Sequence, residues 1–153
     1  MHLILSAIGK LKKSAPEYVL MNTYLKRCKW SVDIKEYEEK KNLSGDALKN
    51  AEADLLLSGI PEKAKVVVLD EHGDTLSSRE FANKLREWQN SGASTVAFLS
   101  GGADGHGEKA KKRANLTLSF GRMTLPHFLM RVVLAEQIYR AQTILDGHPY
   151  HRD

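Results

Sequence analysis

Apolar residues follow two spacings along the chain, and these alternate from one segment to the next. Short apolar runs are typical of buried strands, whereas recurrence every three or four residues is typical of a helix that buries one face. The runs predict five strands, near residues 3–8, 32–34, 65–70, 95–99 and 116–120. The helical spacing predicts helices after each of them, at residues 14–28, 44–58, 77–92, 108–114 and 126–145. This alternation indicates an α/β fold, a mostly parallel sheet with flanking helices in one domain over residues 1–153.

Local signals mark the ends of two of these helices. Ser14 and Ser77 are each followed three residues later by a glutamate, Glu17 and Glu80, which is the spacing of a capping box. Gly92 follows the third helix and is expected as its C-cap. We therefore expect side-chain capping at the start of the first and third helices.

The last predicted helix has apolar residues on nearly all of its sides. They are Phe128, Leu129, Met130, Val132, Val133, Leu134, Ala135, Ile138, Tyr139, Ala141, Ile144 and Leu145. A surface helix of a small domain needs one apolar stripe, so a helix that is apolar all round needs a second covering surface. In a chain of this length we expect that surface to be another subunit, which predicts a homodimer through the C-terminal helix. Packing within one chain is the alternative.

The composition is that of a globular protein without a membrane span. Hydrophobic residues make up 42% and charged residues 27% of the 153 residues, and no apolar run approaches the ~20 residues of a membrane helix. The first residues lack the features of a secretory signal, and the single cysteine, Cys28, excludes an internal disulfide. We expect a cytoplasmic protein and exclude a disulfide scaffold and a mostly disordered chain.

The chain carries a modest positive charge. Lys and Arg number 23 against 19 Asp and Glu, a net charge of +4, and most of the excess lies in residues 101–153. Such a surface tolerates an anionic partner, of which nucleic acid is the usual one. Charge by itself still favours an ordinary solvated basic face.

Three loops follow successive predicted strands, at residues 69–73, 100–105 and 120–126. The carboxyl ends of parallel strands meet at one edge of a sheet, where ligands bind, so we expect these loops to form one site. Two of them contain glycines, which allow the backbone to approach a ligand closely. Leu69, Met123 and Leu125 would wall an apolar slot for a flat ring. Few charged residues line this slot, so a ligand would be recognised mainly by backbone groups. This suits an adenine-containing cofactor without a triphosphate, and the identity of the ligand stays open.

Three common binding motifs are matched only in part, so none of them is assigned. Residues 105–110 match the glycine pattern of a dinucleotide fingerprint, but the acidic residue that should follow is absent and the match falls on the fourth strand. Residues 102–107 have the glycine gap of a phosphate-binding loop without the lysine and hydroxyl residue that should follow. His148 and His151 have no further His or Cys pair to complete a zinc set, so we expect no metal.

Four segments together resemble a known family. They are residues 100–105 (SGGADG), 124–127 (TLPH), 139–141 (YRA) and 148–153 (HPYHRD). With these motifs, and in length and element order, the whole chain resembles the bacterial ribosomal large-subunit pseudouridine-N3 methyltransferases (the RlmH or YbeA family), a branch of the SPOUT superfamily. The chain departs from the common Gly-Gly-Pro-Glu-Gly loop at Ala103 and Asp104, and from the common terminal Glu at Asp153.

The resemblance implies a fold, a cofactor and a substrate. The family fold ties its C-terminal part in a deep trefoil knot, which ordinary topology rules would not predict. The family uses S-adenosylmethionine, forms homodimers and methylates a pseudouridine in a hairpin loop of 23S rRNA within the assembled ribosome. Carried over by position, the cofactor contacts would be Leu69, Gly101, Gly102, Gly121, Arg122, Met123, Thr124, Leu125 and Pro126.

The same resemblance suggests roles for polar residues near the C-terminus. The N3 atom must lose a proton, so a base or a partner for the developing anion should assist. Arg152 and His151, lent by a neighbouring protomer, would hold the base or its phosphate, and Asp104 and His127 would orient a proton path. Tyr150 is the remaining catalytic candidate.

Each of these candidates also has a structural interpretation. Asp104 would cap the following helix, His127 would form a local hydrogen bond, and Tyr150 would anchor the tail by packing. The phosphate contacts of the RNA are expected from the short basic helix, at Lys109, Lys111, Lys112 and Arg113. Two other functions stay open: a different SPOUT enzyme that methylates a tRNA base or ribose, and a non-enzymatic ribosome-associated RNA-binding factor of the same fold.

Overall fold

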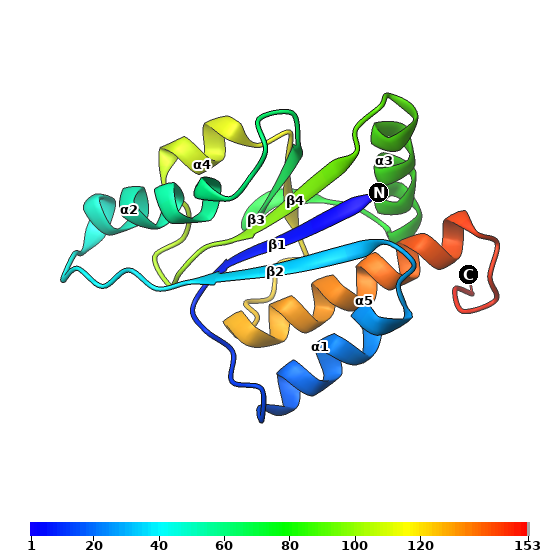
Figure 1. Cartoon of the computed structure of the whole chain (residues 1–153), viewed down its shortest axis with the longest axis horizontal. Helices are drawn as coiled ribbons and strands as arrows, with labels where there is room; N and C mark the ends of the chain where they lie inside the picture. The colour runs from blue at the N-terminus through cyan, green and yellow to red at the C-terminus, as the bar shows by residue number, and fades with distance from the viewer. Residues whose placement is uncertain (153) are drawn as a thin grey trace.

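A computed structural model describes residues 1–152, and Asp153 lies outside the described residues (Figure 1). The described chain forms five strands and five helices. The strands are β1 (His2–Ile8), β2 (Ser31–Tyr37), β3 (Lys65–Thr75), β4 (Thr95–Ser100) and β5 (Leu116–Ser119). The helices are α1 (Pro16–Arg27), α2 (Gly45–Ser58), α3 (Ser78–Asn90), α4 (Glu108–Arg113) and α5 (His127–Leu145).

The strands form one sheet in the order β2-β1-β4-β3-β5, and every neighbouring pair is parallel. This confirms the predicted α/β fold with a parallel sheet. Since all five strands run the same way, their carboxyl ends share one edge of the sheet, and the segments that follow β3, β4 and β5 leave from neighbouring positions on it.

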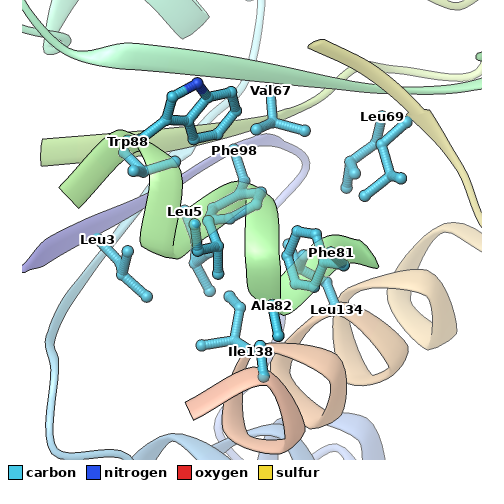
Figure 2. Close-up of a cluster of buried hydrophobic side chains, with 14 residues drawn as sticks. Leu3, Leu5, Val67, Leu69, Phe81, Ala82, Trp88, Phe98, Leu134 and Ile138 are labelled. Atoms are coloured by element: carbon cyan, nitrogen blue, oxygen red, sulfur yellow. The ribbon is translucent and has the colours of Figure 1, made fainter. Parts of the chain in front are cut away.

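Helices cover both faces of this sheet. On one face α2 and α4 pack Leu56 and Ala110 against Val66, Val68 and other apolar residues of the strands. On the other face α3 and α5 pack against the alternate strand residues, and Figure 2 shows part of this layer. There the ring of Phe81 meets that of Phe98 edge-on, with 6.1 Å between the ring centroids. The two-sided burial explains why the central strands are apolar at consecutive positions.

Helix α5 lies between α1 and α3, and this position explains its composition (Figure 1). Val132 and Ala135 pack against Met21 of α1, and Leu134 and Ile138 belong to the cluster that α3 forms with the sheet. Packing within one chain therefore accounts for most of the apolar positions that we had assigned to a second subunit. The apolar character of α5 by itself therefore does not support the predicted homodimer.

Two predicted details are wrong. The first helix has Ala15 rather than Ser14 as its N-cap, because Pro16 occupies the first helical position and its fixed φ angle starts the helix there. Strand β3 continues to Thr75, so the expected loop at 69–73 lies inside the strand as an irregularity between Leu69 and Asp74. The chain resumes pairing with β5 after this interruption.

The third helix begins as predicted and ends one residue early. The Ser77 hydroxyl accepts from the Glu80 amide at 3.2 Å, and the Glu80 carboxylate accepts from the Ser77 amide at 2.7 Å, which confirms the capping box. Ser91 is the C-cap, and Gly92 follows it with a φ of 87°. None of the helices within residues 1–152 combines the length and apolar character needed to cross a membrane.

Candidate active site

A pocket of about 380 Å³ lies at the carboxyl edge of the sheet. It is lined by the irregular segment at residues 69–72 of β3, by the end of β5 and by the loops that follow β4 and β5, so the three segments expected to meet do meet. Of the nine predicted cofactor residues, the lining includes Leu69, Gly101, Gly102, Gly121, Met123, Thr124 and Leu125. Arg122 and Pro126 belong to the same loop but are not part of the lining among the described residues.

The loop after β4 is a tight turn that leaves little room for side chains. The Gly105 amide donates to the Gly102 carbonyl at 3.1 Å, and Gly105 has a φ of 83°, a conformation that favours glycine. A Cβ atom on Gly101 would lie 3.1 Å from the Gly105 carbonyl oxygen. The backbone itself therefore forms this wall of the pocket.

The carboxyl group of Glu52, a residue of α2, lies beside Gly102 of this loop. The sequence pattern did not identify Glu52 as part of the site. Glu52 is only 7% exposed, and within the described chain its Oε2 has no hydrogen-bond partner. Burial raises the pKa of this carboxyl group, the Gly102 amide opposes that shift, and the charge of Asp104 adds to it. The signal available in the sequence was its position beside Ala53 and one turn before Leu56, on the buried face of α2.

We expect Gly102→Ala to destabilise the protein through Glu52. The new Cβ atom would lie 2.7 Å from Oε2 and 2.8 Å from Oε1 of a buried carboxylate, so the Glu52 side chain must leave its buried position or the loop must shift. Overpacking of this kind costs about 1–3 kcal/mol of unfolding free energy. Urea unfolding of Gly102→Ala, Glu52→Ala and the double variant tests it. Gly102→Ala should lower the unfolding free energy much less in the Glu52→Ala protein than in the native protein. Equal losses in the two proteins would show that the contact with Glu52 is not the cause.

His106 lies in the pocket wall and was also missed. It is buried, and its Nε2 lies 3.0 Å from the Leu69 carbonyl oxygen and 3.2 Å from the Gly101 amide nitrogen. It therefore joins the ends of β3 and β4 at two residues predicted to hold a cofactor. Its position directly after the glycine loop was visible in the sequence, but its contacts depend on the packed fold.

His127 and Asp104 both line the pocket. His127 Nε2 lies 2.7 Å from the Ile8 carbonyl oxygen and 2.9 Å from Arg131 Nη2, so it contacts both β1 and the next turn of α5. Burial lowers the pKa of His127, and nearby Arg131 lowers it further. The imidazole is therefore neutral near pH 7, and a neutral imidazole has one nitrogen that accepts a proton. The N-cap of α4 is Gly107, so Asp104 does not cap that helix.

The C-terminal tail folds back on the far end of α5. The Tyr150 hydroxyl donates to Glu136 Oε1 at 3.0 Å, and burial raises the pKa of Tyr150 to about 12. The Arg140 guanidinium lies over the Tyr150 ring, and its Nη1 is 3.2 Å from His151 Nδ1. Tyr150 thus anchors the tail, as its structural interpretation predicts.

Helix α5 separates the predicted catalytic residues into two groups. His127 is at its first residue, whereas His151 and Arg152 follow its last turn. His151 contacts Arg140, which lies about 20 Å along α5 from His127. Figure 1 shows the chain turning back after the carboxyl end of α5. One chain therefore does not bring His151 and Arg152 to its own pocket.

The basic residues of α4 are in different environments. Lys111 lines the pocket and Lys112 is exposed. Lys109 forms an ion pair with Asp54. Arg113 donates through Nη2 to the carbonyl oxygens of Glu62 at 2.7 Å and Ala64 at 2.8 Å, so this side chain already has a structural role. Lys49 of α2 also lines the pocket and was not predicted.

The electrostatic character of the pocket is mixed. Acidic side chains at Asp70, Glu71 and Asp104 line it together with Lys49 and Lys111. Within residues 1–152 no group of three or more His, Cys, Asp or Glu side chains is arranged to hold a metal ion. The pocket therefore offers backbone groups, apolar walls and a few charges, a combination suited to an organic ligand.

Comparison with known proteins places this chain in a large group of similar sequences. Residues 1–151 match the family model described as "Predicted SPOUT methyltransferase". The chain is 54% identical over 152 residues to "Ribosomal RNA large subunit methyltransferase H" of Paramagnetospirillum magneticum, and 48% identical over 152 residues to the protein of the same name of Rhodospirillum centenum. Both alignments cover 99% of each chain.

One solved structure shows a weaker likeness. It is the SpoU methyltransferase AviRb from Streptomyces viridochromogenes in complex with the cofactor AdoMet, with 16% identity and a TM-score of 0.43. The match covers 94% of this chain and 51% of that one, so this chain spans about half the length of that protein. A likeness at this level carries no conclusion about the site.

Proposed function

Because the chain belongs to the SPOUT methyltransferase family, we propose that it methylates N3 of a pseudouridine in a hairpin loop of 23S rRNA on the assembled ribosome, with S-adenosylmethionine as methyl donor. Near-complete alignment at 54% and 48% identity extends the activity in the relatives' names, methylation of large-subunit ribosomal RNA, to this chain. The pseudouridine, its N3 atom and the assembled ribosome are the finer part of the proposal.

The observation that supports the methyl donor most directly is the convergence of three segments in one backbone-lined pocket. A volume of about 380 Å³ lies within the range of small-molecule sites. Leu69, Gly101, Gly102 and the loop at 121–126 would hold the donor, with Leu125 and Met123 against its flat ring. When bound, S-adenosylmethionine supplies a methyl group already activated by its sulfonium, which N3 takes in line as S-adenosylhomocysteine leaves.

The protein groups then have two tasks, to align the base and to favour loss of its proton. Neutral His127 has a nitrogen that accepts a proton, and Asp104 lies across the same pocket. Arg152 of the partner subunit would stabilise the anion that develops at N3. His151 of the partner subunit would hold the base or its phosphate.

The separation of the candidate residues supports a homodimer. His127 begins α5, whereas His151 contacts Arg140, about 20 Å further along the same helix, so a complete site needs the tail of a second copy. Apolar surface is available beside the pocket, where Met123 is 84% exposed and Leu129 of α5 is 41% exposed. Antiparallel pairing of two α5 helices about the middle of the helix would place each tail near the other pocket.

Two further parts of the proposal concern topology and location. The resemblance implies that the C-terminal segments that form the pocket are tied in a trefoil knot, and we retain this as a prediction. An enzyme that modifies assembled bacterial ribosomes meets its substrate in the cytoplasm, which we propose as its location.

Neutralising the basic helix should weaken ribosome binding and its dependence on salt. Each lost phosphate contact to single-stranded RNA lowers the slope of log K against log salt by about 0.7. We expect Lys111→Gln with Lys112→Gln to account for most of the effect, because Lys109 and Arg113 are engaged within the protein. Lys12→Gln with Lys13→Gln changes the charge equally at exposed positions and serves as control. An unchanged slope after neutralising all four α4 residues would remove this assignment.

Mass mapping of RNA from a strain that lacks the gene tests the proposed reaction. Loss of one methyl group from a pseudouridine of 23S rRNA, restored by the native gene, is the expected result. Loss of a tRNA methyl group instead would indicate a different SPOUT enzyme. Intact methylation of all RNA, together with no binding of S-adenosylmethionine in calorimetry, would indicate a non-enzymatic ribosome-binding factor.

A further inference from the structure

His106 makes two contacts with the pocket backbone that compete for one nitrogen. The residue is 5% exposed, and its Nε2 lies 3.0 Å from the Leu69 carbonyl oxygen and 3.2 Å from the Gly101 amide nitrogen. In the part of the chain that the structure describes, its other nitrogen, Nδ1, is buried without a hydrogen-bond partner. Both backbone groups belong to residues that line the pocket.

A neutral imidazole satisfies only one of these backbone groups. The carbonyl of Leu69 needs a donor, so Nε2 must carry the hydrogen, whereas the amide of Gly101 needs an acceptor, so Nε2 must carry the lone pair. Burial lowers the pKa of His106, which keeps the ring neutral near pH 7. In either tautomer, Nε2 therefore forms a hydrogen bond with only one of the two backbone groups.

The geometry favours the tautomer with hydrogen on Nε2. The contact with the Leu69 carbonyl is the shorter of the two, and it is a hydrogen bond of ordinary length. The other tautomer would place an N–H group at Nδ1, where it would be a buried donor without an acceptor, and such donors are rare in folded proteins. With hydrogen on Nε2, His106 offers no acceptor to the Gly101 amide.

We propose that His106 is a positioning residue for the methyl donor: it donates Nε2–H to the Leu69 carbonyl and leaves the Gly101 amide to bind an acceptor atom of that donor. The inference rests on the proposed function, because it assumes that S-adenosylmethionine occupies this pocket. It explains why a buried histidine lies where two strand ends meet, and why Gly101 has no space for a side chain. A Cβ atom there would lie 3.1 Å from the His106 ring.

Binding of S-adenosylhomocysteine to three variants tests the proposal by calorimetry. His106→Leu removes the donor and should weaken binding about tenfold, the effect of one buried hydrogen bond. His106→Gln keeps an N–H donor in its carboxamide and should bind within about threefold of the native protein. His2→Leu is the matched control, because His2 starts β1 at the opposite edge of the sheet, and it should bind normally.

Nitrogen NMR of histidine-labelled protein provides a second reading, because it reports the tautomer of His106 independently of affinity. We expect the His106 signals of the Nε2–H tautomer, both in the unliganded protein and with S-adenosylhomocysteine bound. The Nδ1–H tautomer in the bound protein would overturn the proposal even if His106→Leu failed to fold. Native affinity in His106→Leu would overturn it as well.

The two proposals fail in different ways. If the native protein does not bind S-adenosylhomocysteine, the proposed function fails. If the native protein binds it and the leucine variant binds it equally well, only the role of His106 fails.

Discussion

Replacing Arg152 by alanine lowers the rate of methylation by about 10²- to 10³-fold, the effect of removing one donor from a developing anion. Binding of S-adenosylmethionine stays within about twofold of the native value, because Arg152 is exposed at the end of the tail and is assigned to the RNA base rather than to the methyl donor. The unfolding free energy also stays unchanged, since no core contact is lost.

Single-turnover methylation of ribosomes and calorimetric donor binding measure this prediction together. Arg86→Ala, at an exposed arginine of α3, is the matched control and should behave as the native protein. Full methylation by Arg152→Ala would refute the role of the tail.

Hybrid dimers extend this test to the origin of the tail. Leu125→Trp should block the pocket that Leu125 lines, and Arg152→Ala should disable the tail. If the tail acts on the partner's pocket, a mixture of the two inactive proteins forms hybrid dimers with one intact site each, and it recovers about a quarter of native activity. If the mixture exchanges subunits and still stays inactive, the tail acts on the pocket of its own chain.

Replacing Arg131 by methionine should be the most destabilising change we can identify. Arg131 of α5 is 4% exposed, and its Nη1 donates to Glu36 Oε1 at 2.9 Å. Its Nη2 donates to the carbonyl groups of Ile8 and Gly9 at the end of β1. One side chain thus ties α5 to the carboxyl ends of β1 and β2, beside His127.

The expected loss is about 3 kcal/mol of unfolding free energy, the lower end for a broken buried ion pair because Glu36 is partly exposed. Urea unfolding of Arg131→Met against Arg86→Met measures it, and the control should change stability by less than about 0.5 kcal/mol. A loss below about 1 kcal/mol for Arg131→Met would show that solvent or other groups replace these contacts.

The local pattern of the sequence was sufficient for most of the fold. It predicted ten elements in the correct order, because two-sided burial makes β3 and β4 apolar at consecutive positions and the Ser77 box marks the start of α3. It missed the extension of β3, since residues 70–74 are polar and pairing resumes at Asp74 and Thr75 only because β5 lies beside them. It also misjudged the cause of the apolar character of α5, which depends on helices distant in the sequence.

The candidate site was predictable in outline and not in detail. Strand order places the loops after β3, β4 and β5 together, so the pocket followed from layout alone. Glu52 and His106 were missed because their roles come from contacts with Gly102, Leu69 and Gly101 that no spacing encodes. The tail motif was recognised by resemblance, but only the length of α5 shows that it cannot serve its own pocket.

A crystal structure of the protein with S-adenosylmethionine tests the central claim most directly. We predict donor density against Leu69, Gly101 and Leu125, with the tail of a second protomer closing over it. An empty pocket with the donor bound elsewhere would contradict the account.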